Sequence, residues 1–344
     1  MSVPVTLIAG FLGSGKTTLV RRLLQESHGV RCAVVVNEFG ALGIDGSLVV
    51  QRAAEDSSVV ELSNGCICCE IQDDLRATLL ELVRRGSGAS ASGTAITWLR
   101  RALGGGSAAD GGFDRILVEA SGAASPGPAV QTFLIDDELS RQVHLDGVVT
   151  LAHAARVREQ LDGTREAADQ LAYADRVVVN HADRVDADEL EAVAAHVRAC
   201  NPLADVRTAE HAAAPLDWVF SAPRAEAADA LWKGVDAAGT SHTEGLVSVS
   251  LTAGAPLDRA ALLMWLEFLA KRRGQELMRA KGILRVQGAS SALVVQGVYQ
   301  WLEAVEEDAP APEVSRLVLI GRDLDRDEIA RGWAAIGGDA VKVG

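Results

Sequence analysis

Residues 10–17 constrain the fold of this chain more than any other stretch, and their sequence is Gly-Phe-Leu-Gly-Ser-Gly-Lys-Thr. The apolar run Val3 to Ala9 precedes them, and the residues that follow have helical spacing, with Leu19 and Leu23 on one face. This order predicts a strand, a glycine-rich loop and a helix. The pattern G-x-x-x-x-G-K-[ST] is typical of a loop that holds phosphate groups at a helix N-terminus. The alternative is a glycine-rich turn that binds no nucleotide.

The loop assigns a role to each of its polar groups. Glycines let consecutive backbone N–H groups turn toward a phosphate, and the helix N-terminus adds positive potential. Lys16 is expected to reach the outer phosphates, and the Thr17 hydroxyl is expected to hold Mg²⁺. The predicted nucleotide-binding residues of this loop are Gly13, Ser14, Gly15, Lys16, Thr17 and Thr18.

Composition excludes several classes of protein. The chain has 344 residues, 48% of them hydrophobic, which is enough for two globular domains. Its net charge of −14 argues against nucleic acid or an anionic membrane as a partner, because binding to phosphate backbones needs a basic face. No apolar run approaches the roughly 20 residues that span a bilayer, and the N-terminus enters a strand without a basic region or cleavage site. We therefore expect a cytoplasmic protein.

A second strand, Arg31 to Val36, delivers Asn37-Glu38-Phe39-Gly40 at its C-terminal end. Ligands bind at that edge of a parallel sheet. The loop Gly40 to Gly46 holds three glycines and Asp45, a composition that lets a segment reorder around a γ-phosphate or a metal. Glu38 is thus a candidate catalytic residue and metal ligand. The alternative is an ordinary surface loop with Glu38 in solvent.

Three cysteines lie together after a short strand at Val59 to Leu62, in the stretch Asn64-Gly65-Cys66-Ile67-Cys68-Cys69, before a helix from about residue 72 to 85. A turn into that helix can bring all three thiolates together, and thiolates select Zn²⁺ or Cu(I). Glu38, water or a partner's residue would supply a fourth ligand. Two alternatives are buried cysteines that only pack and a thiol redox switch. The total of five cysteines suits a reduced compartment.

Two further strands end in candidate site residues. Arg115 to Glu119 is followed by Ala-Ser-Gly122, so Glu119 is expected to act on Mg²⁺ or its water shell and Gly122 to approach the γ-phosphate. The strand at residues 176–179 ends in Asn180-His-Ala-Asp183, where a carboxylate can accept from N1–H and the N2 amino group of guanine. Adenine offers no such pair of donors, so Asn180 and Asp183 predict guanine selectivity. The loop at residues 209–213 is expected to lie over the base.

Alternating strands and helices predict an α/β fold with a doubly wound, mostly parallel sheet for residues 1–219. Residues 220–244 lose apolar periodicity and are the predicted linker. Residues 245–344 predict a smaller α+β domain in the order β-α-β-β-β-α, with strands at 246–251, 282–286, 292–296 and 315–320 and helices at 257–272 and 326–333. The stretch 86–112, rich in Gly, Ser and Ala, reads as an insertion without assigned chemistry.

With these motifs collected, the chain resembles the CobW-type family of metal-handling GTPases, relatives of the urease and hydrogenase nickel-insertion GTPases. The resemblance spans nearly the whole chain. It implies slow Mg²⁺-dependent GTP hydrolysis, binding of Zn²⁺, Co²⁺ or similar ions such as Ni²⁺ at Cys66, Cys68 and Cys69, and control of metal transfer to a client protein by the nucleotide state. It also implies that residues 245–344 form the CobW C-terminal domain. The client is not specified, and a homodimer is left open.

One departure from the family pattern affects the base site. The guanine motif of the family is usually Asn-Lys-x-Asp, and here His181 replaces the lysine, whose stem normally packs along the base. We therefore expect weaker nucleotide affinity, with guanine preference still resting on Asp183. The alternative to an enzyme is a nucleotide-gated metal-binding protein whose output is delivery to a partner.

Overall fold

The computed structural model describes residues 2–26, 30–37, 58–62, 69–86, 113–220 and 246–343. By its internal contacts the chain divides into two compact units. The first comprises residues 1–157, 175–186 and 207–224, and the second comprises residues 158–174, 187–206 and 225–344. The predicted linker lies outside the described residues except for Phe220.

The first unit is built around a seven-stranded sheet in the order β3-β2-β4-β1-β5-β6-β7. The strands are β1 (Val3–Gly10), β2 (Cys32–Asn37), β3 (Ser58–Leu62), β4 (Arg115–Glu119), β5 (Val143–His153), β6 (Arg176–Asn180) and β7 (Asp205–Thr208). The pairings β1–β4, β1–β5, β2–β3, β2–β4 and β5–β6 are all parallel. The predicted doubly wound α/β sheet is confirmed.

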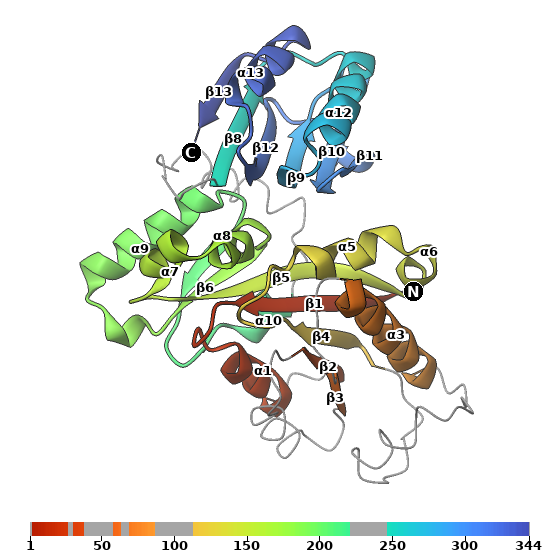
Figure 1. Cartoon of the computed structure of the whole chain (residues 1–344). Coiled ribbons are helices and arrows are strands. Elements are labelled where there is room, and N and C mark those ends of the chain that lie inside the picture. The colour runs from red at the N-terminus through yellow and green to blue at the C-terminus, as the bar shows by residue number, and fades with distance from the viewer. Residues whose placement is uncertain are drawn as a thin grey trace. The chain divides into compact units, whose positions relative to one another are not determined.

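Helices cover both faces of this sheet (Figure 1), which is why β2, β4 and β6 are nearly continuous apolar runs. On one face α1 (Lys16–Gln25) and α10 (Leu216–Phe220) pack in a cluster that contains Leu19, Leu23 and Trp218. On the other face α5 (Gly127–Ile135) contacts β5, and α3 (Cys69–Gly86) packs against α5 and α6 (Asp137–Ser140).

The register of the parallel strands brings their carboxyl ends to one edge. Glu119 at the end of β4 is level with Ile8 of β1 and with Val36 of β2, and Asn37 is level with Leu62 at the end of β3. The phosphate loop therefore begins at the same edge as Glu119. The chain also leaves β2 and β3 at this edge.

Asp136 separates α5 from α6. It leaves the helical conformation, and its side chain accepts a hydrogen bond from the Leu139 N–H (2.7 Å) to cap α6. The helix expected from about residue 72 begins earlier, at Cys69.

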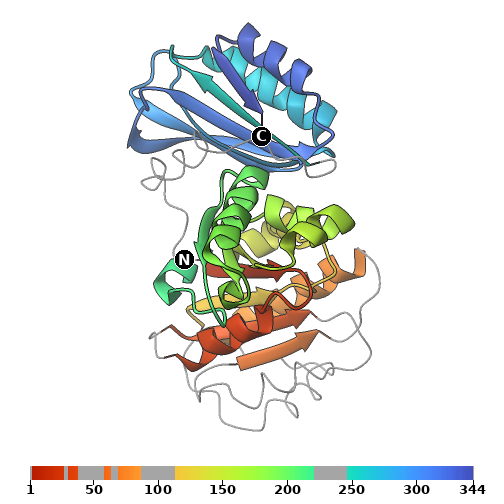
Figure 2. The same ribbon diagram turned by 90° about the vertical axis from the view of Figure 1, so that its left-hand side faces the viewer.

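The second unit contains a six-stranded antiparallel sheet in the order β11-β10-β9-β12-β8-β13. Its strands are β8 (Leu246–Ala253), β9 (Leu277–Leu284), β10 (Ser291–Val298), β11 (Trp301–Pro310), β12 (Ser315–Arg322) and β13 (Ala340–Val343). Figure 2 shows α12 (Arg259–Arg273) and α13 (Arg326–Ala335) on one face of this sheet. The unit also includes α8 (Arg165–Ala172) and α9 (Ala187–Cys200), while α7 (Val157–Gly163) begins at its boundary.

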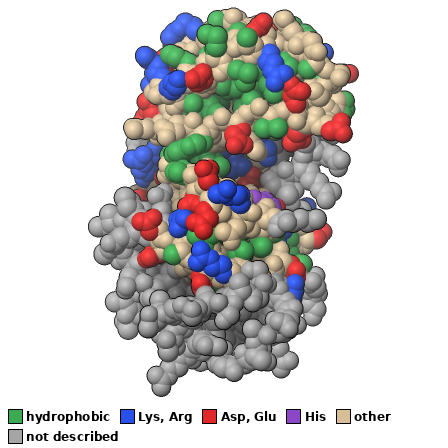
Figure 3. Space-filling model, turned by 90° about the vertical axis from the view of Figure 1, so that its right-hand side faces the viewer, with side chains coloured by type: hydrophobic (Ala, Val, Ile, Leu, Met, Phe, Trp, Pro, Cys, Tyr) green, Lys and Arg blue, Asp and Glu red, His purple; other side chains and the backbone are tan. Residues whose placement is uncertain are grey.

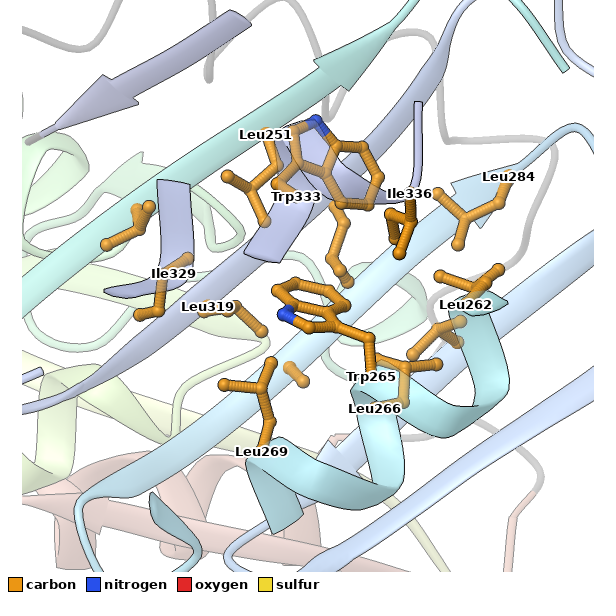
Figure 4. Close-up of a cluster of buried hydrophobic side chains, with 14 of the residues drawn as sticks. Leu251, Leu262, Trp265, Leu266, Leu269, Leu284, Leu319, Ile329, Trp333 and Ile336 are labelled. Carbon is orange, nitrogen blue, oxygen red and sulfur yellow. The ribbon is translucent and has the colours of Figure 1, made fainter. Parts of the chain in front are cut away.

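The core of the C-terminal sheet lies beneath these two helices (Figure 4). Trp265 of α12 and Trp333 of α13 meet with ring centroids 5.6 Å apart, and apolar side chains from four strands surround them. Aspartates cap both helices: Asp258 accepts from Ala261 N–H, and Asp325 accepts from Glu328 N–H. The predicted α+β class is confirmed.

Two strands of this sheet were not predicted. β11 is an edge strand whose residues are mostly exposed and include Glu303, Glu306, Glu307 and Asp308, so it lacks the apolar alternation of a half-buried strand. β13 is the other edge and has only four residues. Both strands form because β10 and β8 offer backbone partners, which no local pattern reveals.

None of the described helices is long and apolar enough to cross a membrane. On the face of the molecule in Figure 3, acidic and basic side chains of the described residues are interspersed, and neither sign gathers into a continuous patch.

Candidate functional site

The phosphate loop joins β1 to α1 in the conformation that its glycines permit. Gly15 immediately precedes the helix with φ of 103°, a region that L side chains rarely adopt, and a Cβ there would lie 2.3 Å from the Asn180 amide nitrogen. Ser14 N–H donates to the Phe11 carbonyl (3.1 Å) and closes the turn. Only glycine fits position 15, because both the backbone angle and the neighbouring amide exclude a side chain.

Lys16 lies inside this loop. Its side-chain amine donates to the Gly10 carbonyl (2.8 Å) and to the Phe11 carbonyl (3.4 Å), and the residue is 8% exposed. Burial lowers the pKa of this amine, and the negative charge of Glu119 opposes that shift. A Cβ at Gly122 would lie 2.9 Å from the amine, so the backbone after β4 runs close to Lys16. The structure thus brings together Lys16, Glu119 and Gly122 from two strand ends.

Thr17 and Glu119 form the second polar pair. The Thr17 hydroxyl donates to a carboxylate oxygen of Glu119 at 2.8 Å, and Glu119 is 5% exposed. A hydroxyl and a carboxylate are the oxygen ligands that Mg²⁺ prefers. The donor set at this edge of the sheet therefore fits that ion.

Asn180 connects the phosphate loop to a distant loop. Its amide nitrogen donates to the Ser14 carbonyl (2.8 Å), its amide oxygen accepts from Ala212 N–H (2.8 Å), and the residue is 1% exposed. The Ala212 carbonyl accepts from the Arg22 guanidinium of α1. His211 and Ala212 both have positive φ (50° and 57°). These hydrogen bonds hold a loop in a conformation that non-glycine residues seldom adopt.

Asp183 lies three residues beyond Asn180 in the 3₁₀ helix η2 (Ala182–Arg184). Its carboxylate pairs with the Arg184 guanidinium (3.1 Å), and its side chain is 33% exposed. A bound base that uses this carboxylate has to compete with Arg184 for it.

His181 makes a contact that the sequence does not suggest. It has φ of 61°, and its ring stacks on the ring of His153, with centroids 4.3 Å apart and an interplanar angle of 20°. His153 is the last residue of β5 and His181 directly follows β6, so the contact depends on the register of β5 with β6. His153 and Arg22 had no sequence signal, because each acquires its place only through tertiary contacts. Ala212 lies in the loop 209–213 that was expected over the base, but its hydrogen bonds to Asn180 and Arg22 were not predicted.

The proposed metal ligands are mostly outside the described residues. This applies to Glu38, Cys66 and Cys68, and for Cys69 only its position as the first residue of α3 is described. Cys32 and Cys200 are buried thiols, and burial raises the pKa of the Cys32 thiol to about 11. The described part of the chain contains no cluster of three His, Cys, Asp or Glu side chains able to hold a metal ion.

Family models match most of the chain. The model of the CobW/HypB/UreG nucleotide-binding domain matches residues 4–208, and the model of the cobalamin synthesis protein CobW C-terminal domain matches residues 246–336. The zinc chaperone YjiA of Escherichia coli is 31% identical over 97% of this chain and 98% of its own length. The zinc chaperone CobW of Pseudomonas aeruginosa is 32% identical over 95% of this chain and 90% of its own length.

A solved structure has the same fold. The crystal structure of Zn(II)-bound YjiA GTPase from E. coli superposes with a TM-score of 0.68 at 26% identity, over 98% of this chain and 99% of that one. A Zn(II)-bound triple mutant of YjiA, in which one glutamate and two cysteines are replaced by alanine, superposes with a TM-score of 0.70. The full-length relatives and the two family models lead to one conclusion: this chain belongs to the CobW/HypB/UreG family, with a CobW C-terminal domain.

Proposed function

We propose that the protein is a Mg²⁺-dependent GTPase that binds Zn²⁺ at Cys66, Cys68 and Cys69 and passes the ion to a client protein. The observation that carries the nucleotide part is the pair of hydrogen bonds of Asn180: its amide nitrogen donates to the Ser14 carbonyl of the phosphate loop, and its amide oxygen accepts from the Ala212 N–H. Two relatives are named zinc chaperones, which supports the metal part. The YjiA structure is named a GTPase, which supports the nucleotide part.

In this proposal each residue of the phosphate site acts on the nucleotide. Lys16, already inside the loop, turns from the Gly10 and Phe11 carbonyls to the outer phosphates and stabilises the charge that develops on the phosphoryl group. Gly122 lets the backbone approach the same group. Mg²⁺, when bound, would neutralise phosphate charge, and Thr17 and Glu119 are the residues that would hold it or its water shell.

Asp183 selects the base in this proposal. Its carboxylate leaves Arg184 and accepts from N1–H and the N2 amino group of guanine, a pair of donors that adenine lacks. The described side chains at this edge include no obvious strong general base, so turnover is expected to be slow unless Glu38 supplies that role.

The metal part rests on sequence and topology together. The chain leaves β2 at Asn37, immediately before Glu38, and leaves β3 at Leu62, shortly before Cys66, and both strand ends lie at the edge that carries Glu119. A γ-phosphate at this edge would therefore lie near the two strand ends from which the chain continues to Glu38 and to Cys66. We propose that the presence or loss of that phosphate changes the affinity for zinc at the thiolates.

The nucleotide claim is tested by measuring the hydrolysis of GTP and of ATP by the purified protein, with and without Mg²⁺. GTP hydrolysis that depends on Mg²⁺ and exceeds ATP hydrolysis by at least tenfold supports the proposal. Equal rates for the two nucleotides would show that Asp183 does not select guanine.

The metal claim is tested by titrating Zn²⁺, Co²⁺ and Ni²⁺ into the wild type and into a Cys66/Cys68/Cys69→Ser variant. Zinc is reported bound to the YjiA triple mutant, so that relative binds zinc without the three substituted residues. The readout is therefore stoichiometry: the variant should lose one tight site and keep any others. Unchanged stoichiometry and affinity would remove the three cysteines from the proposal, and reversible disulfide formation without zinc binding would favour a redox switch.

A further inference from the structure

The stacked rings of His153 and His181 form a compact feature next to the proposed base site. His153 ends β5, and His181 follows β6 directly. The Ala154 N–H donates to the Asn180 carbonyl (2.9 Å), so the backbone ties the two strand ends together beside the rings. The stack is therefore part of the frame that holds Asn180.

A hydrogen bond to the His153 ring indicates which ring nitrogen carries the proton. The Ala155 N–H donates to Nδ1 of His153 (3.3 Å), which makes Nδ1 an acceptor and leaves the ring proton on Nε2. Adding a proton to Nδ1 would break this hydrogen bond, because the nitrogen would no longer have a lone pair to offer.

The surroundings of the stack are cationic. His153, Ala155, Arg156, His181 and Arg184 line a cavity of about 360 Å³. No carboxylate is among these lining residues, and the nearby Asp183 carboxylate is paired with Arg184. Burial first, and then His181, Arg156 and Arg184, lower the pKa of His153. A proton on His153 would place a positive charge against two guanidinium groups and a stacked imidazole.

His181 connects this stack to the base-selecting residue. The Arg184 N–H donates to the His181 carbonyl (3.0 Å), closing the turn that contains Asp183. Because His181 has a positive φ, its ring position and the course of the following turn are linked through one constrained backbone residue. A displacement of the His181 ring that changes the backbone angles of this residue would therefore move Asp183.

We propose that the His153–His181 stack positions the guanine-selecting turn and makes guanine nucleotide binding sensitive to protonation in mildly acidic solution. This inference rests on the proposed GTP site. The neutral stack holds the turn in its binding conformation, and protonation of His153 drives the rings apart. Because the nucleotide-bound state has to release that proton, the affinity for guanine nucleotide falls by up to about tenfold per pH unit below the pKa of His153 in the nucleotide-free protein.

The test measures the Kd of GDP at fixed Mg²⁺ from pH 8.0 to pH 5.5 for the wild type, His153→Asn and His181→Gln. Asparagine keeps an acceptor for the Ala155 N–H without a titrating ring. The control is His196→Gln, which removes a half-buried histidine of α9 whose pKa is also lowered, chiefly by burial. Titration of the GDP phosphates and of the metal affects all four proteins equally.

We expect the wild type and His196→Gln to lose at least twofold more affinity over this range than either stack variant, because the pKa of His153 is lowered and only part of the protonation falls within it. Superimposable pH profiles for all four proteins would overturn the inference while leaving the GTP site intact. Failure of the wild type to bind GDP even at pH 7.5 would instead refute the proposed function. Circular dichroism at each pH checks folding, and either stack variant alone suffices if the other does not fold.

Discussion

Two parts of the proposed nucleotide site are assembled in opposite ways. One is the phosphate loop, and the other is the guanine corner, which we define as residues 180–184 with the loop 209–213. The phosphate loop is almost complete within eight consecutive residues, and Lys16 and Ser14 bond to carbonyls of the same loop. The guanine corner draws Asn180, His153, Ala212 and Arg22 from four separate segments. In the proposed function, phosphate binding is thus a local property of this chain, whereas base selection is a tertiary one. Substitutions should accordingly separate chemistry from selectivity.

The largest effect on GTP hydrolysis is expected from a substitution in the phosphate loop. Lys16→Met keeps a side chain of similar length but removes the only charge inside the loop, so GTP hydrolysis should fall by about 10²-fold or more. The folded apo protein should change little in stability, because the substitution also removes the cost of burying an amine whose pKa is lowered. Single-turnover hydrolysis and urea unfolding measure the two quantities. Hydrolysis within threefold of wild type would mean that Lys16 does not act on the phosphates.

Asn180→Ala should affect both the phosphate loop and the guanine corner, because it removes the side chain that joins them. The backbone groups of Ser14 and Ala212 would lose a buried partner, at about 2–4 kcal/mol of unfolding free energy. Nucleotide affinity should fall at least tenfold. The matched control is Asn201→Ala, since Asn201 is equally buried and bonds to Leu171, Ala174 and Leu203, none of which is a site residue.

Urea unfolding and GDP titration of the two asparagine variants separate general destabilisation from a specific loss. We expect similar destabilisation in both and weaker GDP binding only in Asn180→Ala. If Asn201→Ala loses as much GDP affinity as Asn180→Ala, the link between the phosphate loop and the guanine corner has no functional role.

The same contrast explains how much the sequence predicted. The order strand, loop and helix around Lys16 is encoded within about 25 residues, and the position of Glu119 follows from the rule that parallel strands end at one edge. The His153–His181 stack and the Arg22–Ala212 hydrogen bond depend on strand register and on the path of a loop. The edge strand β11 was missed for a related reason, since its residues are mostly exposed and its partner is the backbone of β10.

Asp183→Asn should change base preference and leave phosphate chemistry intact. An amide offers one donor and one acceptor, so it loses a hydrogen bond to guanine, and GTP affinity should fall by roughly 10- to 100-fold. Xanthine carries an oxygen in place of the N2 amino group, so xanthosine triphosphate should bind the variant better than GTP. Competition between the two nucleotides measures the switch, and unchanged GTP preference would refute the role of Asp183.

The smallest effect is expected at Arg22. Arg22→Met removes the donor that holds the Ala212 carbonyl while keeping the aliphatic stem, and should weaken GDP binding by about fivefold. Arg22 also pairs with Glu26 on the exposed side of α1, so Glu26→Gln is the control that keeps the contact to Ala212. Equal GDP affinities for Arg22→Met and Glu26→Gln would indicate that the loop conformation does not need Arg22.

The central claim is that the nucleotide controls the affinity for metal. Its most direct test is the Kd of zinc for the full-length protein with GDP and with a non-hydrolysable GTP analogue, measured by competition with a chelator of known affinity. The account predicts Kd values that differ by at least fivefold, and no such difference in Cys66/Cys68/Cys69→Ser, because a ligand shifts an equilibrium only by its differential binding. Equal zinc affinities in the two nucleotide states would contradict it.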